Sequence, residues 1–393
     1  MNLFFATFCL LGQAPAPEAE EAVAPAAAPA PDRWPLMQAL QGTYPGWLLD
    51  GAKLKLYGWI DSTFTASSDR HEQLPMGFNY RANEGQLQQA WVRFERPVDQ
   101  TANAPTFGFR SDTFFGIDYR FTIARGLFDS QLTADHGRSN LYGFDPVQFY
   151  AEAYFPHICR GLDVKVGRFF AQFGAESIDT TQTVFVSRSY SFIYDPFTHT
   201  GLLTTLKLTD TWSVQNGVAT GCDVFIDPAC TPTYLGSVKW APPNGRSTAL
   251  FAVILCSGRF DQNQNFHNPQ IFDLVFTHKL GPRLTYTLDA LYGFTHNVPN
   301  TGFANWWATD HYLSWTLAPR VTANARLEFF DDEQGQRTGF EGLYTALTAG
   351  LAVTPNRYVL FRPEVRYDYN GTSRPFEGKH GVFTAALDMV VRW

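Results

Sequence analysis

Alternation between apolar and polar residues is the feature that most restricts the fold of this chain. In residues 381–393, GVFTAALDMVVRW, one side of an extended strand carries only apolar side chains, which are Phe383, Ala385, Leu387, Met389, Val391 and Trp393. The other side holds both charges, Asp388 and Arg392. A period of two is typical of a β-strand with unlike faces. The segment therefore predicts a strand that lies between an apolar phase and water.

The same alternation recurs from Lys53 onward, as in VTANARLEF (321–329) and RLTYTLDALY (283–292). Tight connections such as LGPR and TPNR take turns with longer polar ones. The longer ones lie near 66–84, 119–146, 175–187, 222–233, 258–268, 295–305, 333–341 and 369–380. Strands joined in this way are antiparallel neighbours, and both chain ends then lie at the tight-turn end. This arrangement requires an even number of strands, and the count is about 16.

The composition separates a membrane barrel from the alternatives. No apolar run approaches the roughly 18 residues that a membrane-spanning helix needs, and the aromatic content of 16% suits many short strands. A soluble propeller or sandwich would need a blade repeat or two interior faces, and the sequence has no repeat at a fixed period. We therefore predict an all-β fold, a closed antiparallel transmembrane β-barrel with short periplasmic turns and long external loops.

Three regions divide the chain. Residues 1–16 predict a signal peptide, although no Lys or Arg precedes Arg33. Residues 17–52 form an Ala/Pro-rich linker with a short helix near 34–50, which could be a surface segment or a plug. Residues 53–393 are the barrel. Export and insertion would place the protein in the outer membrane of a Gram-negative-type envelope.

Five cysteines suit an oxidising compartment without proving one. Cys222 and Cys230 bracket the loop CDVFIDPAC, which predicts a local disulfide, and Cys256 could compete for either of them. Cys9 lies in the predicted signal peptide and Cys159 in a predicted turn.

Two charged ladders form the candidate functional site. Arg326, Glu328 and Asp332 share one side of a strand, and a second set shares one side of the next strand but one, namely Arg362, Glu364, Arg366 and Asp368. The strand between them offers small residues on that side, so side chains could meet across roughly 10 Å. The ladders predict a charged network on the lumen wall. It could set ion preference, in which case replacing Arg362 and Arg366 with Ala shifts selectivity towards cations, or it could brace the wall.

Loop 119–146 is the longest polar connection and carries several Arg and acidic residues. It could fold into the mouth and narrow the barrel, or it could be an ordinary external loop.

Four segments carry a family resemblance: GRFFAQFGAE (167–176), SRSYSFIYDPFTHTGLLTT (187–205), ARLEFFDDEQGQRTG (325–339) and RPEVRYDYN (362–370). They resemble the OmpL-like β-barrel porin family of outer-membrane proteins, and 108–118 is a looser match. The resemblance implies a porin without defining its substrate. The closing strand with its terminal aromatic also resembles the signal that barrel-insertion machinery recognises, which here comprises Phe383, Leu387, Met389, Val391 and Trp393.

The expected function is passive diffusion of ions and small hydrophilic solutes through a water-filled lumen, since 16 strands leave an aqueous passage. The net charge of −7 hints at a mild cation preference. The expected partners are membrane lipids, lipopolysaccharide, the insertion machinery, the solutes and, as one assembly, a homotrimer. The alternative is a closed structural or adhesive barrel.

Other classes lack a supporting pattern. The sequence has no Lys/Arg-rich run for nucleic acid and no HExxH, CxxC, GxSxG or phosphate-loop spacing, so we expect no enzyme and no cofactor. A lipid-modifying enzyme is the third alternative, but His311 and Ser314 have opposite parity. FDDEQGQR gathers three acids without calcium-loop spacing, so we expect no metal.

Overall fold

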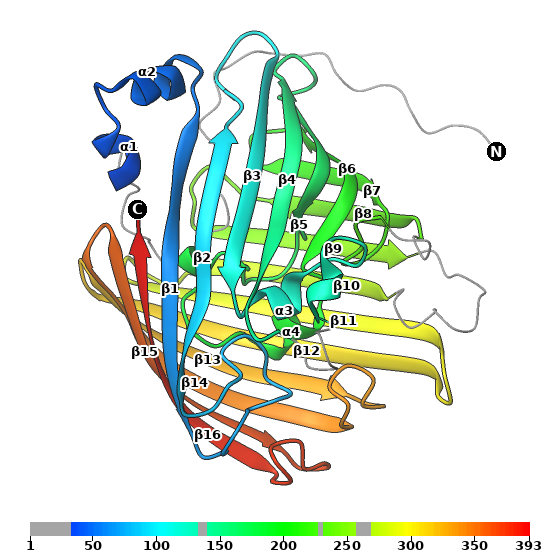
Figure 1. The fold of residues 1–393 in the computed structure, drawn as a ribbon. Helices are drawn as coiled ribbons and strands as arrows, with labels where there is room; N and C mark the ends of the chain where they lie inside the picture. The colour runs from blue at the N-terminus through cyan, green and yellow to red at the C-terminus, as the bar shows by residue number, and fades with distance from the viewer. Residues whose placement is uncertain (1–32, 133–139, 227–230, 257–268) are drawn as a thin grey trace, which may run out of the picture.

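The computed structural model describes residues 33–132, 140–226, 231–256 and 269–393. Sixteen strands close into one antiparallel barrel, in which β1 pairs with β16 (Figure 1). They are β1 (Lys55–Ser67), β2 (Glu84–Arg96), β3 (Thr106–Gly116), β4 (Gly143–Phe155), β5 (Leu162–Phe170), β6 (Thr198–Lys207), β7 (Trp212–Ala219), β8 (Thr233–Trp240), β9 (Ser247–Cys256), β10 (Gln270–Lys279), β11 (Leu284–Val298), β12 (Gly302–Ala318), β13 (Val321–Asp332), β14 (Gly342–Asn356), β15 (Val359–Asn370) and β16 (Gly381–Arg392). The predicted fold and strand number are confirmed.

Side-chain burial follows the predicted alternation. In β16, Phe383 and Leu387 are each 49% exposed on the outer surface, whereas Asp388 is 1% exposed on the inner one. Moving apolar surface from water into hydrocarbon is favourable by about 25 cal/mol per Å². Such an outer surface is therefore suited to the interior of a membrane. The closed ladder also pairs the edge strands, since Trp393 and Gly58 exchange backbone hydrogen bonds of 2.9 and 3.1 Å. A closed sheet leaves no strand edge unpaired.

The two ends of the barrel differ in their connections. Tight turns such as 208–211 and 280–283 lie at the end where β1 begins and β16 ends. We call this the turn end. Longer connections such as 68–83 and 333–341 lie at the opposite, loop end. The prediction of a long connection at 295–305 is wrong. β11 continues to Val298 and β12 begins at Gly302, because alternation persists through these residues and leaves only 299–301 as a turn.

Short helices lie at both ends of the barrel. At the turn end are α1 (Pro35–Ala39) and α2 (Tyr44–Gly51), beside the C-terminus (Figure 1). The side chain of Thr43 begins α2 by accepting a hydrogen bond from the Gly46 amide at 3.2 Å. Trp34 stacks on Tyr57 of the lumen wall with ring centroids 5.6 Å apart. The remaining helices lie in connections that start at the loop end: α3 (Tyr119–Thr122), η1 (Asp129–Leu132), η3 (Thr180–Gln182) and α4 (Tyr190–Tyr194). Of these, η3 reaches towards the turn end, where Arg392 donates to the Thr181 carbonyl at 3.3 Å. Among the described residues, no helix has the length and apolarity to cross a membrane.

The connection between β5 and β6 enters the barrel, and we call residues 171–197 the inner loop. Its contacts reach the middle of the wall, since two of its amides bond to Glu364, halfway along β15. An aromatic cap lies over it. Phe78, from the β1–β2 connection, contacts Phe121 of α3 and Phe192 and Phe197 of the inner loop at centroid distances of 5.1 to 5.7 Å. α3 is part of the predicted loop 119–146, so the described start of that segment contributes to the cap. Residues 133–139 lie outside the described part, and β4 begins at Gly143.

Candidate functional site

Acidic side chains of the lumen wall hold the inner loop through its backbone. Glu364 accepts hydrogen bonds from the amides of Val186 and Ser187 at 2.7 and 3.1 Å. Similar bonds run from Gly174 to Asp273 (2.8 Å), from Ala175 to Asp289 (2.7 Å) and from Tyr190 to Glu328 (3.0 Å). A chain segment inside a barrel has no strand ladder for its amides, so those without a backbone partner need side-chain or water acceptors. The wall acids therefore fix the path of the loop.

Arginines of the same wall bind the carbonyl groups of the inner loop. Arg362 donates to the carbonyls of Thr180 and Thr183 at 2.9 and 2.8 Å. Arg366 donates to the carbonyl of Arg188 at 2.8 Å, and Arg326 to that of Ser187 at 3.0 Å. Arg326 also pairs with the loop carboxylate of Glu176 at 2.6 Å. Each guanidinium has several donors in a planar fork, so it can bridge wall and loop at once.

The predicted ladder residues lie on the lumen side, and four of them touch one another. Arg326 lies 2.7 Å from Glu328, and Arg366 lies 3.1 Å from Glu328 and 2.7 Å from Asp368. All four side chains are 0% exposed. The small neighbours in β14 leave room, since Glu328 pairs in register with Ala346 and Ala346 with Asp368.

The other three ladder residues have different partners. Arg362 pairs with Asp388 of β16, with Nε 3.0 Å from Oδ2. Glu364 bonds to the inner loop, as described above. Asp332 accepts hydrogen bonds from the amides of residues 336–338 at 2.7 to 3.0 Å, so it shapes the β13–β14 connection instead.

Several site residues were not predicted. Arg93 of β2 pairs with Asp112 at 2.7 Å and reaches Asp179 of the inner loop at 3.3 Å. Asp310 of β12 accepts a hydrogen bond from Ser191. Asp388 was visible on the polar side of the closing strand, and its parity could have added it to the ladders. The contacts of Glu176 and Asp179 had no sequence signal, because they depend on the path of the inner loop.

The inner loop leaves part of the wall uncovered. Its hydrogen bonds to the wall reach β2, β10, β11, β12, β13, β15 and β16, which we call the covered arc. On the other side of the loop, Gln172, Ala175 and Gln182 are exposed. We call β3–β8 the open arc, because none of these hydrogen bonds joins it to the loop. The loop still meets this arc at one place, where Phe173 packs against the buried cluster that contains Leu203 and Leu235. The half-buried inward side chains of the open arc include Arg110, Lys165, Lys207 and Lys239.

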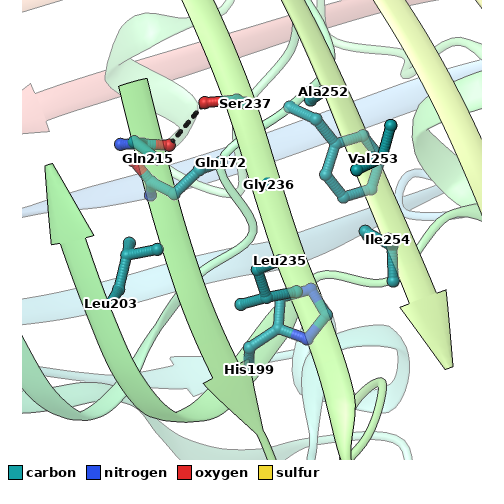
Figure 2. Close-up of a pocket in the computed structure, with 11 residues that line it drawn as sticks. Gln172, His199, Leu203, Gln215, Leu235, Gly236, Ser237, Ala252, Val253 and Ile254 are labelled. Carbon is teal, nitrogen blue, oxygen red and sulfur yellow. Dashed lines mark hydrogen bonds between the residues drawn. The ribbon is translucent and has the colours of Figure 1, made fainter. Parts of the chain in front are cut away.

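A hollow of about 20 Å³ lies between the start of the inner loop and the wall (Figure 2). Polar lining comes from Gln172, Gln215 and Ser237, and apolar lining from Leu203 and Leu235. Ser237 donates to Gln215 at 3.0 Å, as the dashed line marks. This volume suits about one water molecule. The inner loop thus also narrows the lumen near β6–β9.

Burial shifts the pKa of charged groups in the connecting segments. It raises the pKa of Asp118 to about 7, against the attraction of Arg188. It raises the pKa of Asp223 to about 6, although backbone amides of Phe197 and Thr198 donate to that carboxylate. It lowers the pKa of the Arg188 guanidinium, which Glu176 partly offsets. Asp118 and Asp223 lie in connections at the loop end, so stability at that end should depend on pH.

The remaining candidate residues are accounted for as follows. Cys222 lies 3.2 Å from Cys256, sulfur to sulfur, whereas Cys230 lies outside the described residues, so its predicted disulfide stays a prediction. His311 and Ser314 do not meet, since the His311 ring bonds to the Tyr286 hydroxyl at 2.8 Å. Within the described ranges, no three His, Cys, Asp or Glu side chains are grouped to hold a metal ion.

Comparison with known families decides the assignment. Residues 53–392 match the model of the family described as "Putative beta-barrel porin-2, OmpL-like". The chain belongs to this porin family. No curated protein matches the OmpL-like chain. The resemblance in the four sequence segments is therefore confirmed, and both family and fold indicate an outer-membrane channel rather than an enzyme.

Solved structures share the fold of this OmpL-like porin. An anion-selective porin from Comamonas acidovorans has a TM-score of 0.58 at 8% identity, covering 86% of this chain and 99% of that chain. The outer membrane channel DcaP of Acinetobacter baumannii has a TM-score of 0.55 at 12% identity, covering 86% and 97%. OmpT of Vibrio cholerae with loop L8 deleted has a TM-score of 0.54 at 10% identity, covering 86% and 99%. At such identities the likeness shows the fold alone.

Proposed function

We propose that this porin lets ions and small hydrophilic solutes diffuse passively between the inner loop and the open arc. The observation that carries the proposal is the one-sided attachment of the inner loop. Its amides and carbonyls bond to the covered arc, while Gln172, Ala175 and Gln182 stay exposed. Polar side chains on the loop and charged ones on the opposite wall suit a hydrated solute. No bond needs to be made or broken during passage.

The charges along this passage favour anions. On the open arc the half-buried inward charges are Arg110, Lys165, Lys207 and Lys239 against Glu152, which pairs with Lys165 at 3.5 Å. Arg110 pairs at 2.8 Å with Glu95 of β2, so the positive balance lies towards Lys207 and Lys239, near the turn end. Glu95 and Asp163 are nearly buried, at 5% and 9% exposed. Some acids that make the whole chain negative lie behind the inner loop, as Asp273 and Asp289 do. Their charges do not count towards the charge that a solute meets. We therefore replace the cation preference expected from net charge with an anion preference, since charged rings near the path set selectivity.

A closed barrel is the second candidate, and the aromatic cap favours it. Phe78 is 2% exposed and packs against aromatic residues from two other connections at the loop end. Purified protein in planar bilayers distinguishes the two functions. Stepwise single-channel openings, with an upper size limit for sugars of graded mass, are expected for the channel. An inserted barrel that stays silent at all voltages would support the closed one.

The surroundings of the barrel follow from its surface. The exposed apolar residues of β16, Phe383, Leu387 and Met389, would contact membrane lipid, and lipopolysaccharide would lie in the outer leaflet. With Val391 and Trp393, they would also present the closing strand to the insertion machinery. We also propose that the porin forms a homotrimer and that residues 1–16 are cleaved as a signal peptide.

A further inference from the structure

Two cysteines from different hairpins meet at the loop end of the lumen wall. Cys256 is the last residue of β9 and is 4% exposed. Cys222 lies in the connection between β7 and β8 and packs against the buried cluster that contains Cys256. Their sulfur atoms are 3.2 Å apart, and the Thr233 hydroxyl lies 3.4 Å from the Cys256 sulfur. A disulfide bond of about 2.05 Å needs a further approach of only about 1.2 Å.

The residue after Cys222 holds the end of the inner loop. The Asp223 carboxylate accepts hydrogen bonds from the amides of Phe197 and Thr198 at 3.0 and 2.8 Å. The Asp223 amide donates in return to the Thr198 carbonyl at 3.0 Å. Phe197 is the last residue of the inner loop, and Thr198 is the first of β6. Whatever fixes Cys222 therefore also fixes the point where the inner loop leaves the lumen.

We propose that Cys222 and Cys256 form a disulfide that locks the exit of the inner loop. The oxidant is a dithiol–disulfide donor of the oxidising envelope compartment. The thiolate of one cysteine attacks the donor disulfide, forming a mixed disulfide and releasing one donor thiolate. The second cysteine then displaces the other donor sulfur, and the Cys222–Cys256 bond forms. Two electrons pass to the donor, and the two protons of the cysteine thiols end on its two sulfurs.

The bond would link parts of the chain that the ladder alone does not join. It closes a loop between residues 34 positions apart and ties the β7–β8 connection to the end of β9. The competing pair, Cys222 with Cys230, would close only the local loop and would add no link between that loop and the end of β9. The two pairings therefore differ in the peptides they cross-link and in the segments they restrain.

Peptide mapping of the full-length barrel, refolded in detergent with oxidised glutathione, tests the bond. Free thiols are alkylated without reductant, and the digest is analysed by mass spectrometry. We expect a cross-linked peptide with Cys222 and Cys256, lighter than its two parts by two hydrogens. It should persist in Cys159→Ser, a control at the opposite end of the barrel, and vanish in Cys256→Ser. A Cys222–Cys230 peptide, or alkylated Cys222 and Cys256, would overturn the proposal, and the wild-type map alone suffices for this.

Hydrogen exchange tests the locking role without any channel measurement. Reduction of the wild-type disulfide should speed exchange at the amides of Phe197 and Thr198 several-fold. Cys256→Ser should exchange at that faster rate with or without reductant, whereas Cys159→Ser should respond like the wild type. If reduction leaves both amides at their original rates while the cross-linked peptide disappears, the lock does not exist.

Discussion

The two arcs of the barrel wall use charge in opposite ways. On the covered arc, Arg366 and Glu328 are fully buried and bond to each other and to the inner loop. On the open arc, Lys207 and Lys239 are half-buried on the lumen side of the wall, near the turn end. Both sets lie on the polar side of alternating strands. Alternation therefore identifies lumen-facing charges, but the path of one internal loop decides which of them brace the wall and which meet a solute.

Removal of the inner loop should produce the largest effect. Replacing residues 175–192 with a short Gly/Ser linker uncovers the wall acids and arginines and widens the passage. We expect single-channel conductance to rise several-fold, because ion flow grows with the open cross-section. The control replaces residues 98–104 of the β2–β3 connection, which lie at the turn end, and should leave conductance unchanged. Unchanged conductance after removal of the inner loop would place the passage elsewhere.

Arg366→Ala should destabilise the covered arc strongly. Loss of this guanidinium leaves Asp368 and Glu328 with one partner fewer while both stay buried. Breaking a buried ion pair on one side costs about 3–5 kcal/mol. The midpoint of urea unfolding in detergent should fall accordingly, as followed by Trp fluorescence. Lys207→Ala, on the open arc, is the matched control and should move the midpoint little.

Ion preference should depend on the open arc alone. Lys207→Glu with Lys239→Glu reverses two charges beside the passage, so the reversal potential in a KCl gradient should shift towards cations. Arg362→Ala with Arg366→Ala removes charges that lie beneath the inner loop. These variants should alter stability and leave the reversal potential near the wild-type value if the barrel still folds. A selectivity shift in the arginine variants alone would favour the earlier hypothesis that the ladders select ions.

The sequence predicted the strands of the barrel wall better than the inner loop that lies between them. Alternation alone indicated that Arg326, Glu328, Arg366 and Asp368 face the lumen, because side-chain direction in a strand is a local property. It did not indicate the inner loop, because contacts such as Glu176 with Arg326 join residues 150 positions apart. Length and polarity drew attention to 119–146, whereas the predicted connection 175–187 is the middle of a longer segment, 171–197. Its apolar and aromatic residues, as in VFVSRSYSFIY, resemble strand residues until their lumen contacts are known.

Stability at the loop end should depend on pH through Asp118. Burial raises its pKa to about 7 from an ordinary value of 3.8. Between these values the folded protein binds a proton that the unfolded chain has released, so the free energy of unfolding falls as pH rises through this window. Asp118→Asn should weaken this dependence between pH 4 and 7, and Asp223 should account for part of the slope that remains. Asp210→Asn, at an exposed position in a tight turn, is the control. An unchanged slope in Asp118→Asn would show that Asp118 carries the ordinary pKa.

Arg160→Ala should have the smallest effect, because it removes an ion pair of the same length at an exposed position. Arg160 and Asp210 are 2.7 Å apart, the same separation as Arg366 and Asp368. Their side chains are 34% and 40% exposed, however, so water solvates each partner when the other is removed. Exposed pairs contribute about 0–1 kcal/mol, and the urea midpoint should therefore stay close to the wild-type value. If Arg160→Ala and Arg366→Ala lowered it equally, distance rather than burial would govern these pairs, and the inner loop would not be what makes the covered arc different.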